Sequence, residues 1–534
     1  MKRSLTLILA LLLALSMCAV QADNEHAFTP YEETVTITTG KQLVASPNFL
    51  EGDSQGDNYM TRAIKDELNI EVKLLWESDE YASKISLCIA ADDLPDMFVS
   101  PNYITYASLV ENEKLADLSE VWQTYATDFT LEVCNSYNTP WTEALTDADG
   151  HLYCIASPNY YYDGSSLMWL RQDWMDALGL QTPKTIDELH DVLVAFKDSY
   201  NSQLVFQKEP IAGYGSLFSS WGICSALNAY PSIWTENAEG KVEYGSVSAQ
   251  MKEAVKLLNA WYNEGLIDPE FPTYDTNAVA AKFNAGETGV LFGPWWVSFQ
   301  LGDSLKLEGC KVAPYNVPAD ADGKVNLCDP SNYGAQLLVS RECMNPEAVV
   351  KMFGMQFEIF GNGGGTEYTA KYNDVTAKTR AANTGWGALF PCGGVNAVKA
   401  DGVLQANRAT HDLLEKGEFQ RDDYTTAQKM VSEKAVAYSR GETEDVNGWI
   451  YYMGYYVAGD LFQAENVQHI PQTFAQQTES MGELWASLET LEDTTIMAMI
   501  VGEKSVDDWD DFVAQWYAQG GDIITEEVNE ACGR

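Results

Sequence analysis

Strand and helix patterns alternate regularly over the first hundred residues, and this alternation is the feature that most limits the possible folds. β-branched residues alternate from Thr34 to Thr39, which predicts a strand ending before Gly40. The elements expected next are a helix over Tyr59–Leu68, a strand over Ile70–Trp76, a helix over Tyr81–Ala91 and a strand over Asp96–Ser100. This order is typical of an α/β domain with a mainly parallel sheet flanked by helices. The loop Lys41–Asp57, after the first strand, is a candidate for ligand contact.

Strand and helix patterns also occur further along the chain. A strand is expected over Leu167–Leu170, and amphipathic helices over Thr185–Lys197 and Ser248–Asn263. The chain has 534 residues, which exceeds what a single core usually holds, so two or more lobes are expected.

The charge of the chain excludes two classes of partner. With 78 acidic against 33 basic side chains, the net charge is −45. Such a chain repels phosphate backbones and anionic lipid headgroups. We therefore expect no nucleic-acid partner and no role on a membrane surface.

The N-terminus has the layout of an export signal, which we assign to residues 1–22. Lys2 and Arg3 precede an apolar run from Leu5 to Leu15 that is too short to span a bilayer permanently. Two processing routes remain open. Leu15-Ser16-Met17-Cys18 is similar to a bacterial lipobox with a bulky Met, and Val20-Gln21-Ala22 is similar to an ordinary signal-peptidase site. We favour lipidation of Cys18, which predicts a protein on the outer face of a bacterial cytoplasmic membrane.

Motifs for metal, cofactor or catalytic chemistry are missing from the sequence. The ten cysteines contain no Cys-x-x-Cys pair, and the five histidines are scattered. Neither a Gly-x-Ser-x-Gly elbow nor a His-Glu-x-x-His motif occurs. We therefore predict no cofactor, no metal and no enzymatic activity.

The stretch Gly286–Trp296 (GETGVLFGPWW) gives the first indication of a ligand site. Its apolar strand is bounded by glycines, and Pro294 forces the chain out of the sheet just before Trp295 and Trp296. Ligands of open α/β sheets bind beyond strand ends, where such rings would stand. Both indoles could instead belong to the core.

Several blocks, in order along nearly the whole chain, resemble one family. They are Tyr81–Met97 (YASKISLCIAADDLPDM), Leu170–Lys184 (LRQDWMDALGLQTPK), Lys241–Gly245, Leu257–Phe271 (LLNAWYNEGLIDPEF), Gly286–Trp296 and Ile500–Asn529. The set is similar to the extracellular solute-binding proteins of bacterial ABC importers, family 1, in the oligosaccharide-binding branch of Gram-positive lipoproteins.

The resemblance implies a two-lobed periplasmic-binding-protein-like fold of type II, in which each lobe is a mixed, mainly parallel sheet flanked by helices. Lobe 1 would comprise residues 23–157 and 333–420, and lobe 2 residues 158–332 and 421–534. The implied crossings lie near Ser157–Ser166, Asp329–Gly334 and roughly Leu414–Tyr424. The ligand would sit in a cleft that closes by hinge motion. The implied partners are an oligosaccharide and the transmembrane subunits of an ABC permease, and the protein is expected to be a monomer.

One departure from the family concerns calcium. Many relatives carry a calcium loop after the helix that corresponds to Thr185–Lys197. Here Tyr200 occupies a ligand position in Asp198–Leu204, and no glycine follows at the sharp turn. We expect no calcium in this segment.

A sugar cleft needs flat aromatic platforms for the apolar ring faces and polar groups for the hydroxyls. The candidate ligand-binding residues are Trp295, Trp296, Trp221, Tyr161, Asp163, Trp386, Trp449, Tyr451 and Tyr452. For each ring, a place in the core is an equally good interpretation. Two other functions remain open: a secreted glycoside hydrolase, and a glycan-binding sensor or adhesion module that serves no transporter.

Overall fold

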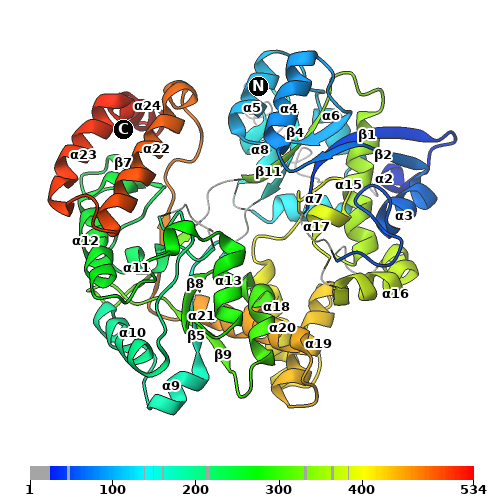
Figure 1. Cartoon of the computed structure of the whole chain (residues 1–534). Coiled ribbons are helices and arrows are strands. Elements are labelled where there is room, and N and C mark those ends of the chain that lie inside the picture. Colours follow the sequence, from blue (N-terminus) through cyan, green and yellow to red (C-terminus); the bar gives the residue numbers. More distant parts are fainter. Residues whose placement is uncertain are drawn as a thin grey trace, which may run out of the picture.

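The computed structural model describes residues 25–44, 48–137, 139–147, 149–158, 162–211, 217–329, 333–362, 366–382 and 384–534. The export signal and Cys18 lie outside these ranges. Within them the chain forms two lobes that sit side by side, with a group of helices beneath their junction (Figure 1).

Lobe 1 is built on a five-stranded sheet in the order β2-β1-β3-β11-β4. β1 runs parallel to β2 and β3, whereas β11 runs antiparallel to β3 and β4, so the sheet is mixed. The strands are β1 (Val35–Gln42), β2 (Ile70–Ser78), β3 (Met97–Val99), β4 (Cys154–Pro158) and β11 (Tyr333–Val339). The helices are α2 (Glu25–Phe28), α3 (Tyr59–Leu68), α4 (Tyr81–Ala91), α5 (Tyr103–Glu111), α6 (Ser119–Tyr125), α7 (Asp128–Asn135), α8 (Trp141–Leu145), α15 (Pro346–Phe360), α16 (Glu367–Ala382) and α17 (Trp386–Leu389).

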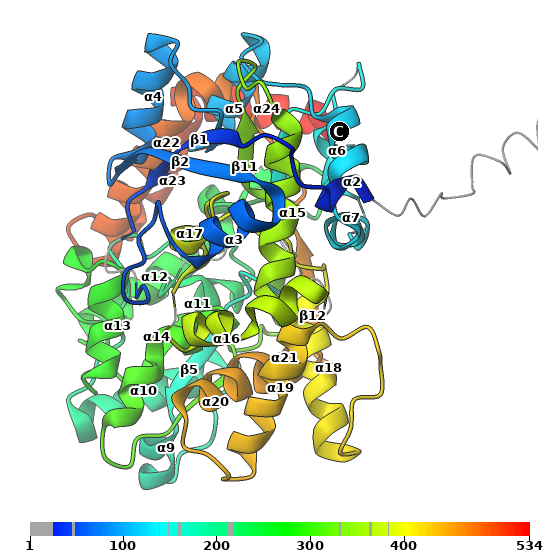
Figure 2. The same ribbon diagram turned by 90° about the vertical axis from the view of Figure 1, so that its right-hand side faces the viewer.

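Both faces of this sheet are covered, because successive residues of a strand point to opposite sides. Met97, Ile155 and Leu337 join one apolar core, while their neighbours Phe98, Cys154 and Leu338 join a second. α15 is buried along almost its whole length and passes close to β1, as Figure 2 shows.

Lobe 2 contains a three-stranded sheet in the order β8-β5-β9, with a parallel pair β10-β12 and a hairpin β6-β7. The strands are β5 (Leu167–Arg171), β6 (Trp234–Glu236), β7 (Val242–Tyr244), β8 (Val290–Gly293), β9 (Val312–Asn316), β10 (Val325–Asp329) and β12 (Val467–Pro471). The α-helices are α9 (Gln172–Leu178), α10 (Ile186–Tyr200), α11 (Trp221–Ser225), α12 (Ala249–Asn263), α13 (Thr276–Asn284), α14 (Ser298–Leu301), α18 (Gly402–Glu415), α19 (Thr426–Ser439), α20 (Val446–Tyr451), α21 (Ala458–Phe462), α22 (Glu479–Ile500), α23 (Trp509–Trp516) and α24 (Asp522–Ala531). The short segments are η1 (Gly245–Val247), η2 (Phe271–Thr273), η3 (Trp295–Val297), η4 (Gly302–Lys306), η6 (Val506–Asp508) and the π-helical turns η5 (Tyr452–Val457) and η7 (Tyr517–Gly521).

The α/β architecture with mixed sheets and flanking helices is confirmed, but strand direction differs from the prediction in lobe 2. β5 runs antiparallel to both β8 and β9, so the described three-stranded sheet is not mainly parallel. The reason is topological. β8 and β9 share one direction, and β5, which enters from lobe 1, is inserted between them in the opposite direction.

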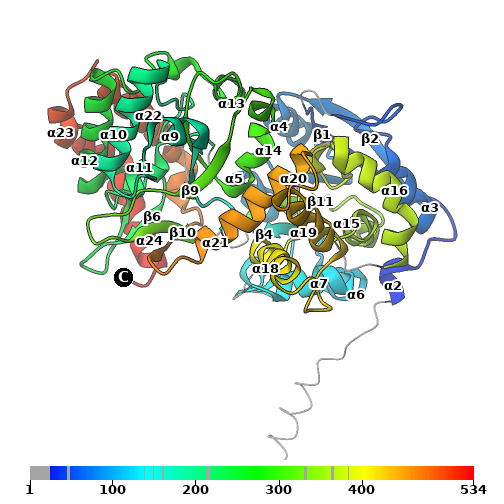
Figure 3. The ribbon, with the colours of Figure 1, turned by 90° about the horizontal axis from the view of Figure 1, so that it is seen from below.

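The third crossing lies earlier than the expected segment Leu414–Tyr424. Val395 and Ala397 belong to the core of lobe 1, whereas Val403 and Ala406 of α18 belong to the core of lobe 2. α18 packs against α19, and this contact draws it away from lobe 1. Seen from below, α18, α19 and α20 lie at the junction of the two lobes (Figure 3).

Eight cysteines within the described residues are free thiols: Cys88, Cys134, Cys154, Cys224, Cys310, Cys343, Cys392 and Cys532. Among the described residues, no helix has both the length and the apolar character needed to cross a membrane.

Candidate functional site

A cavity of about 340 Å³ lies between the two cores, and we call it the aromatic cavity. Phe129, Phe360 and Ala397 on its wall belong to the core of lobe 1, whereas Trp295 and Val431 belong to the core of lobe 2. The remaining lining residues are Phe299, Asn362, Arg380, Thr384, Gly385, Trp386, Val398, Lys399, Gly402, Val403, Ala406, Thr425, Ala427, Gln428, Tyr451 and Tyr455. Its volume is in the range of small-molecule sites, which are typically about 300–1,000 Å³.

Trp295 reaches this cavity because β8 ends where the sequence predicts. β8 stops at Gly293, Pro294 adopts an extended conformation, and η3 begins at Trp295. The Trp295 side chain is 5% exposed and packs against Tyr455, with 4.5 Å between the ring centroids. Its Nε1 is buried and has no hydrogen-bond partner among the described residues. An unsatisfied buried donor of this kind costs about 1–3 kcal/mol.

The wall next to Trp295 comes from α20 and the π-helical turn η5. Gly454 allows η5 to approach η3 closely, since a Cβ there would lie 2.7 Å from Ser298 Oγ and 3.1 Å from Trp295 O. Tyr451 and Tyr455, four residues apart, both reach the cavity. π-helical turns occur often at functional sites, and Tyr455 of η5 lines the cavity together with Tyr451 at the end of α20.

The wall contributed by lobe 1 is centred on Trp386. Its ring stacks on Phe390, with 5.5 Å between centroids and 20° between planes, and packs edge-on against Phe360. Lys41, at the end of β1, donates from Nζ to the carbonyls of Ala388 (2.9 Å) and Phe390 (3.0 Å). Burial lowers the pKa of Lys41 to about 8. Lys41 therefore ties the segment that carries Trp386 to the central sheet.

Arg380 places a guanidinium group on the cavity wall. Its Nη2 donates to Phe360 O (2.7 Å) and to Asn362 Oδ1 (3.4 Å), and the group lies 4.0 Å from the centre of the Phe360 ring. Burial lowers the pKa of Arg380. Lys399 also lines the cavity, but its Nζ is paired with Glu132 at 2.6 Å. The cavity thus combines aromatic platforms with one cation that has no carboxylate partner among the described residues.

Two other cavities border lobe 1. One of about 490 Å³ lies at the ends of β1 and β3 and includes Lys41, Asp79, Glu80 and Tyr81. One of about 720 Å³ is lined by Asn102 and Gln336 of lobe 1 and by Gln476 and Arg534 of lobe 2. Ser100, Pro101 and Ala335 line both, so these two cavities adjoin. The cavity of about 720 Å³ therefore also lies between the lobes, and the aromatic cavity shares no lining residue with either of these two.

Three of the nine predicted ligand residues line the aromatic cavity: Trp295, Trp386 and Tyr451. Trp449, only 1% exposed, packs against Trp169 and donates from Nε1 to Val312 O (3.3 Å). Trp221 packs with Tyr230 in a separate small core. Both indoles are therefore packed in core regions, away from this cavity.

Trp296, Asp163 and Tyr452 do not line the aromatic cavity. Trp296 is half-buried and donates from Nε1 to the backbone carbonyl of Asp163 (3.1 Å), so it fastens the first crossing. Tyr452 stacks on Tyr456, with 5.2 Å between centroids. Tyr161 lies outside the described residues.

The sequence prediction missed Phe299, Phe360, Arg380 and Tyr455. The sequence contained an indication for two of them, in their spacing from predicted residues. Phe299 follows Trp295 by four residues and Tyr455 follows Tyr451 by four, which is the spacing of side chains on one helical face. Phe360 and Arg380 carried no local signal, because only the packing of α15 and α16 brings them to the cavity.

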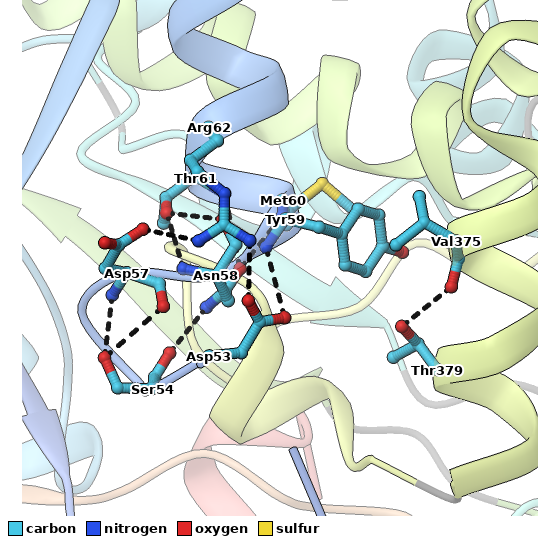
Figure 4. Close-up of polar contacts among 10 residues, drawn as sticks. All are labelled: Asp53, Ser54, Asp57, Asn58, Tyr59, Met60, Thr61, Arg62, Val375 and Thr379. Atoms are coloured by element: carbon cyan, nitrogen blue, oxygen red, sulfur yellow. Dashed lines mark hydrogen bonds and ion pairs between the residues drawn. The ribbon is translucent and has the colours of Figure 1, made fainter. Parts of the chain in front are cut away.

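In the loop Lys41–Asp57, predicted as a ligand candidate, Lys41 lines the cavity at the strand ends, whereas Asp53 and Asp57 turn toward α3. Arg62 of α3 bonds Asp53 and Asp57, each at 2.6 Å, and the Asn58 side chain caps α3 through Met60 N and Thr61 N. Figure 4 shows these side chains turned toward one another and toward the N-terminus of α3. This part of the loop therefore stabilises the N-terminus of α3.

The segment compared with a calcium loop ends α10 and is occupied by an aromatic contact. Tyr200 stacks on Trp174, with 4.2 Å between centroids and 10° between planes. Asn201 closes the helix in the left-handed conformation (φ 54°). Across the described ranges, no group of three or more His, Cys, Asp or Glu residues could hold a metal ion.

Comparison with known proteins gives a consistent result. Residues 52–357 match the family described as bacterial extracellular solute-binding protein. The fructooligosaccharide ABC transporter substrate-binding protein FusA of Streptococcus pneumoniae serotype 4 is 24% identical over 386 residues, which are 66% of this chain and 68% of that protein. The polygalacturonan/rhamnogalacturonan-binding protein YtcQ of Bacillus subtilis is 24% identical over 290 residues, which are 53% of this chain and 56% of that protein.

Solved structures agree on the fold. An EF-hand mutant of FusA in complex with fructo-nystose has a TM-score of 0.64 and 17% identity, and covers 93% of this chain and 99% of its own. The alginate-binding protein AlgQ2 without calcium ion has a TM-score of 0.61 and 16% identity, and covers 95% of this chain and 100% of its own. The family match spans more than half of the chain, and the resemblance found in the sequence is confirmed: this chain belongs to the bacterial extracellular solute-binding protein family.

Proposed function

We propose that this protein captures an oligosaccharide in the space between its lobes and delivers it to the transmembrane subunits of an ABC transporter. The observation that carries this proposal is the aromatic cavity, where Trp295 of lobe 2 faces a wall of lobe 1 that holds Trp386. Aromatic faces pack against the apolar faces of sugar rings, and polar side chains on the wall such as Arg380 and Gln428 suit their hydroxyls.

The proposed ligand contacts are Trp295, Trp386, Tyr451 and Tyr455, with Arg380 and Gln428 as polar neighbours. Names of relatives support the ligand class, since FusA is called a fructooligosaccharide-binding protein and YtcQ a polygalacturonan/rhamnogalacturonan-binding protein. A ligand longer than one sugar suits the adjoining cavities of about 490 and 720 Å³. The predicted lipid on Cys18 would keep the receptor beside its permease.

The family is non-catalytic, which removes the glycoside hydrolase alternative. We expect an oligosaccharide to be recovered unchanged after long incubation with concentrated protein.

The deciding experiment is a thermal-shift screen over plant and host oligosaccharides, followed by calorimetry. A ligand at about 100 times its dissociation constant adds roughly 2.7 kcal/mol to the free energy of unfolding, which is readily visible as a raised Tm. No shift with any oligosaccharide, together with a shift from peptides or amino acids, would overturn the proposal. Binding to the permease in vesicles separates a transport receptor from a sensor or adhesion module.

A further inference from the structure

The aromatic cavity differs in charge from the rest of the molecule. The chain carries 78 acidic side chains, yet none of the residues that line this cavity is acidic. Two are cationic, Arg380 and Lys399, and Lys399 is already paired with Glu132. By contrast, the cavity at the strand ends places Asp79 and Glu80 around the same space as Lys41. The wall of the aromatic cavity therefore carries cationic side chains and no carboxylate.

Arg380 retains unused hydrogen-bonding capacity. Its only hydrogen bonds among the described residues come from Nη2, to Phe360 O and Asn362 Oδ1, so Nε and Nη1 remain without partners there. The carbonyl of Phe360 ends α15, where the helix dipole stabilises a cation. This contact orients the guanidinium group, but it does not neutralise it.

A desolvated guanidinium without a counter-charge is costly, and burial already lowers the pKa of Arg380. Two parallel N–H groups of a guanidinium match the two oxygens of a carboxylate, and such charge-assisted pairs are about twice as strong as neutral hydrogen bonds. A neutral sugar hydroxyl would satisfy one N–H and leave the charge unmatched.

We propose that the sugar bound in the aromatic cavity carries a carboxylate, as uronic and sialic acid residues do, and that Arg380 receives it. This rests on the oligosaccharide-binding function proposed above. The neighbouring rings of Trp295, Trp386 and Tyr455 pack on the apolar faces of the same and adjacent sugars. The net charge of −45 repels anions from the molecule as a whole, whereas no carboxylate lines the aromatic cavity.

The test pairs each acidic probe with its neutral counterpart. The probes are oligogalacturonate, oligoalginate and oligohyaluronate with their carboxyl-reduced forms, and sialyllactose with lactose. Dissociation constants are measured by calorimetry on the full mature chain. We expect one acidic probe to bind roughly tenfold to a hundredfold more tightly than its neutral counterpart. The probe that does so separates a uronic from a sialic acid ligand.

Three variants test whether the preference for an acidic probe depends on Arg380. Arg380→Gln should bring the ratio of acidic to neutral binding close to one. Arg380→Lys keeps the positive charge but lacks the planar guanidinium group, so it should retain part of the preference for the acidic probe. Arg341→Gln is the matched control, because that guanidinium is exposed and pairs with Glu113 on the surface. Since Arg380 also bonds α15, the Tm of each free variant is recorded.

The possible results distinguish failure of the carboxylate proposal from failure of the oligosaccharide-binding proposal. Equal binding of acidic and neutral probes by the wild type, or a preference unchanged in Arg380→Gln, overturns the carboxylate proposal. Binding of neutral oligosaccharides alone overturns it too, while leaving the oligosaccharide-binding function intact. Absence of binding by every oligosaccharide overturns both. Should Arg380→Gln fail to fold, the wild-type ratio and Arg380→Lys still decide.

Discussion

The indole ring of Trp295 and the phenol ring of Tyr455 pack with 4.5 Å between their centroids, and this contact joins the end of β8 to the π-helical turn η5. Both rings line the aromatic cavity. The contact therefore connects the sheet of lobe 2 to the helices beneath the lobe junction, so a ligand held there touches both.

Trp295 and Trp449 form a matched pair of tests, since both indoles are almost fully buried in one core but only Trp295 lines the cavity. We expect Trp295→Phe to reduce the Tm increase that an oligosaccharide ligand produces, with a loss of about 1 kcal/mol in binding because aromatic contacts contribute ~0.5–1.5 kcal/mol beyond their area. Trp449→Phe should lower the Tm of the free protein but leave the ligand-induced increase unchanged. Equal losses in both variants would contradict the role given to Trp295.

Gly454→Ala tests whether close approach of η5 shapes the cavity. The added Cβ would meet Ser298 Oγ at 2.7 Å, so η5 must move away from η3. We expect a loss of about 1–3 kcal/mol in the free energy of unfolding, measured by urea denaturation, and weaker ligand binding. Gly482→Ala in α22 is the control, because nothing lies within 4 Å of its added Cβ. It should stabilise the protein by about 0.5–1 kcal/mol.

Glu492 makes stability depend on pH. The side chain is 3% exposed, its Oε2 has no hydrogen-bond partner among the described residues, and burial raises its pKa from 4.5 to about 8. Since the folded protein holds this proton more tightly than the unfolded chain, its stabilising effect is complete below pH 4.5. It is lost as the pH rises to about 8.

Glu492→Gln should remove this dependence. We expect the difference in unfolding free energy between Glu492→Gln and the wild type to grow between pH 4.5 and 8, by at most about 1.4 kcal/mol per pH unit, and then to level off. Glu483→Gln, exposed on the same helix, is the control and should leave the pH profile unchanged. Parallel profiles for Glu492→Gln and the wild type would refute the assignment.

Calcium should leave the Tm unchanged at millimolar concentration. Tyr200 occupies a position that a calcium loop gives to an oxygen ligand, and its ring is held against Trp174. A saturable rise in Tm that disappears in Asp198→Asn would show that Asp198–Leu204 binds calcium after all.

Local sequence determined the individual elements well. The helices Tyr59–Leu68 and Tyr81–Ala91 have the predicted bounds, and each ends at a residue in the left-handed conformation, Asn69 and Asp92. The strand before Pro294 also ends as predicted. These features follow from side-chain periodicity, caps and the fixed φ of proline, which depend on near neighbours in the chain.

Tertiary structure alone decided which aromatic residues share a cavity. Trp295 and Trp449 look alike in sequence, but packing of η5 against η3 leaves one on the cavity wall and the other against Trp169. It also decided that β5 runs antiparallel to its neighbours, that α18 joins lobe 2, and that Arg380 meets rings from both lobes in a cavity without carboxylates. The physical reason is that these features come from contacts between segments far apart in the chain, whose energy no local pattern encodes. The sequence by itself determined the family and its elements, and the packing of two lobes determined the site.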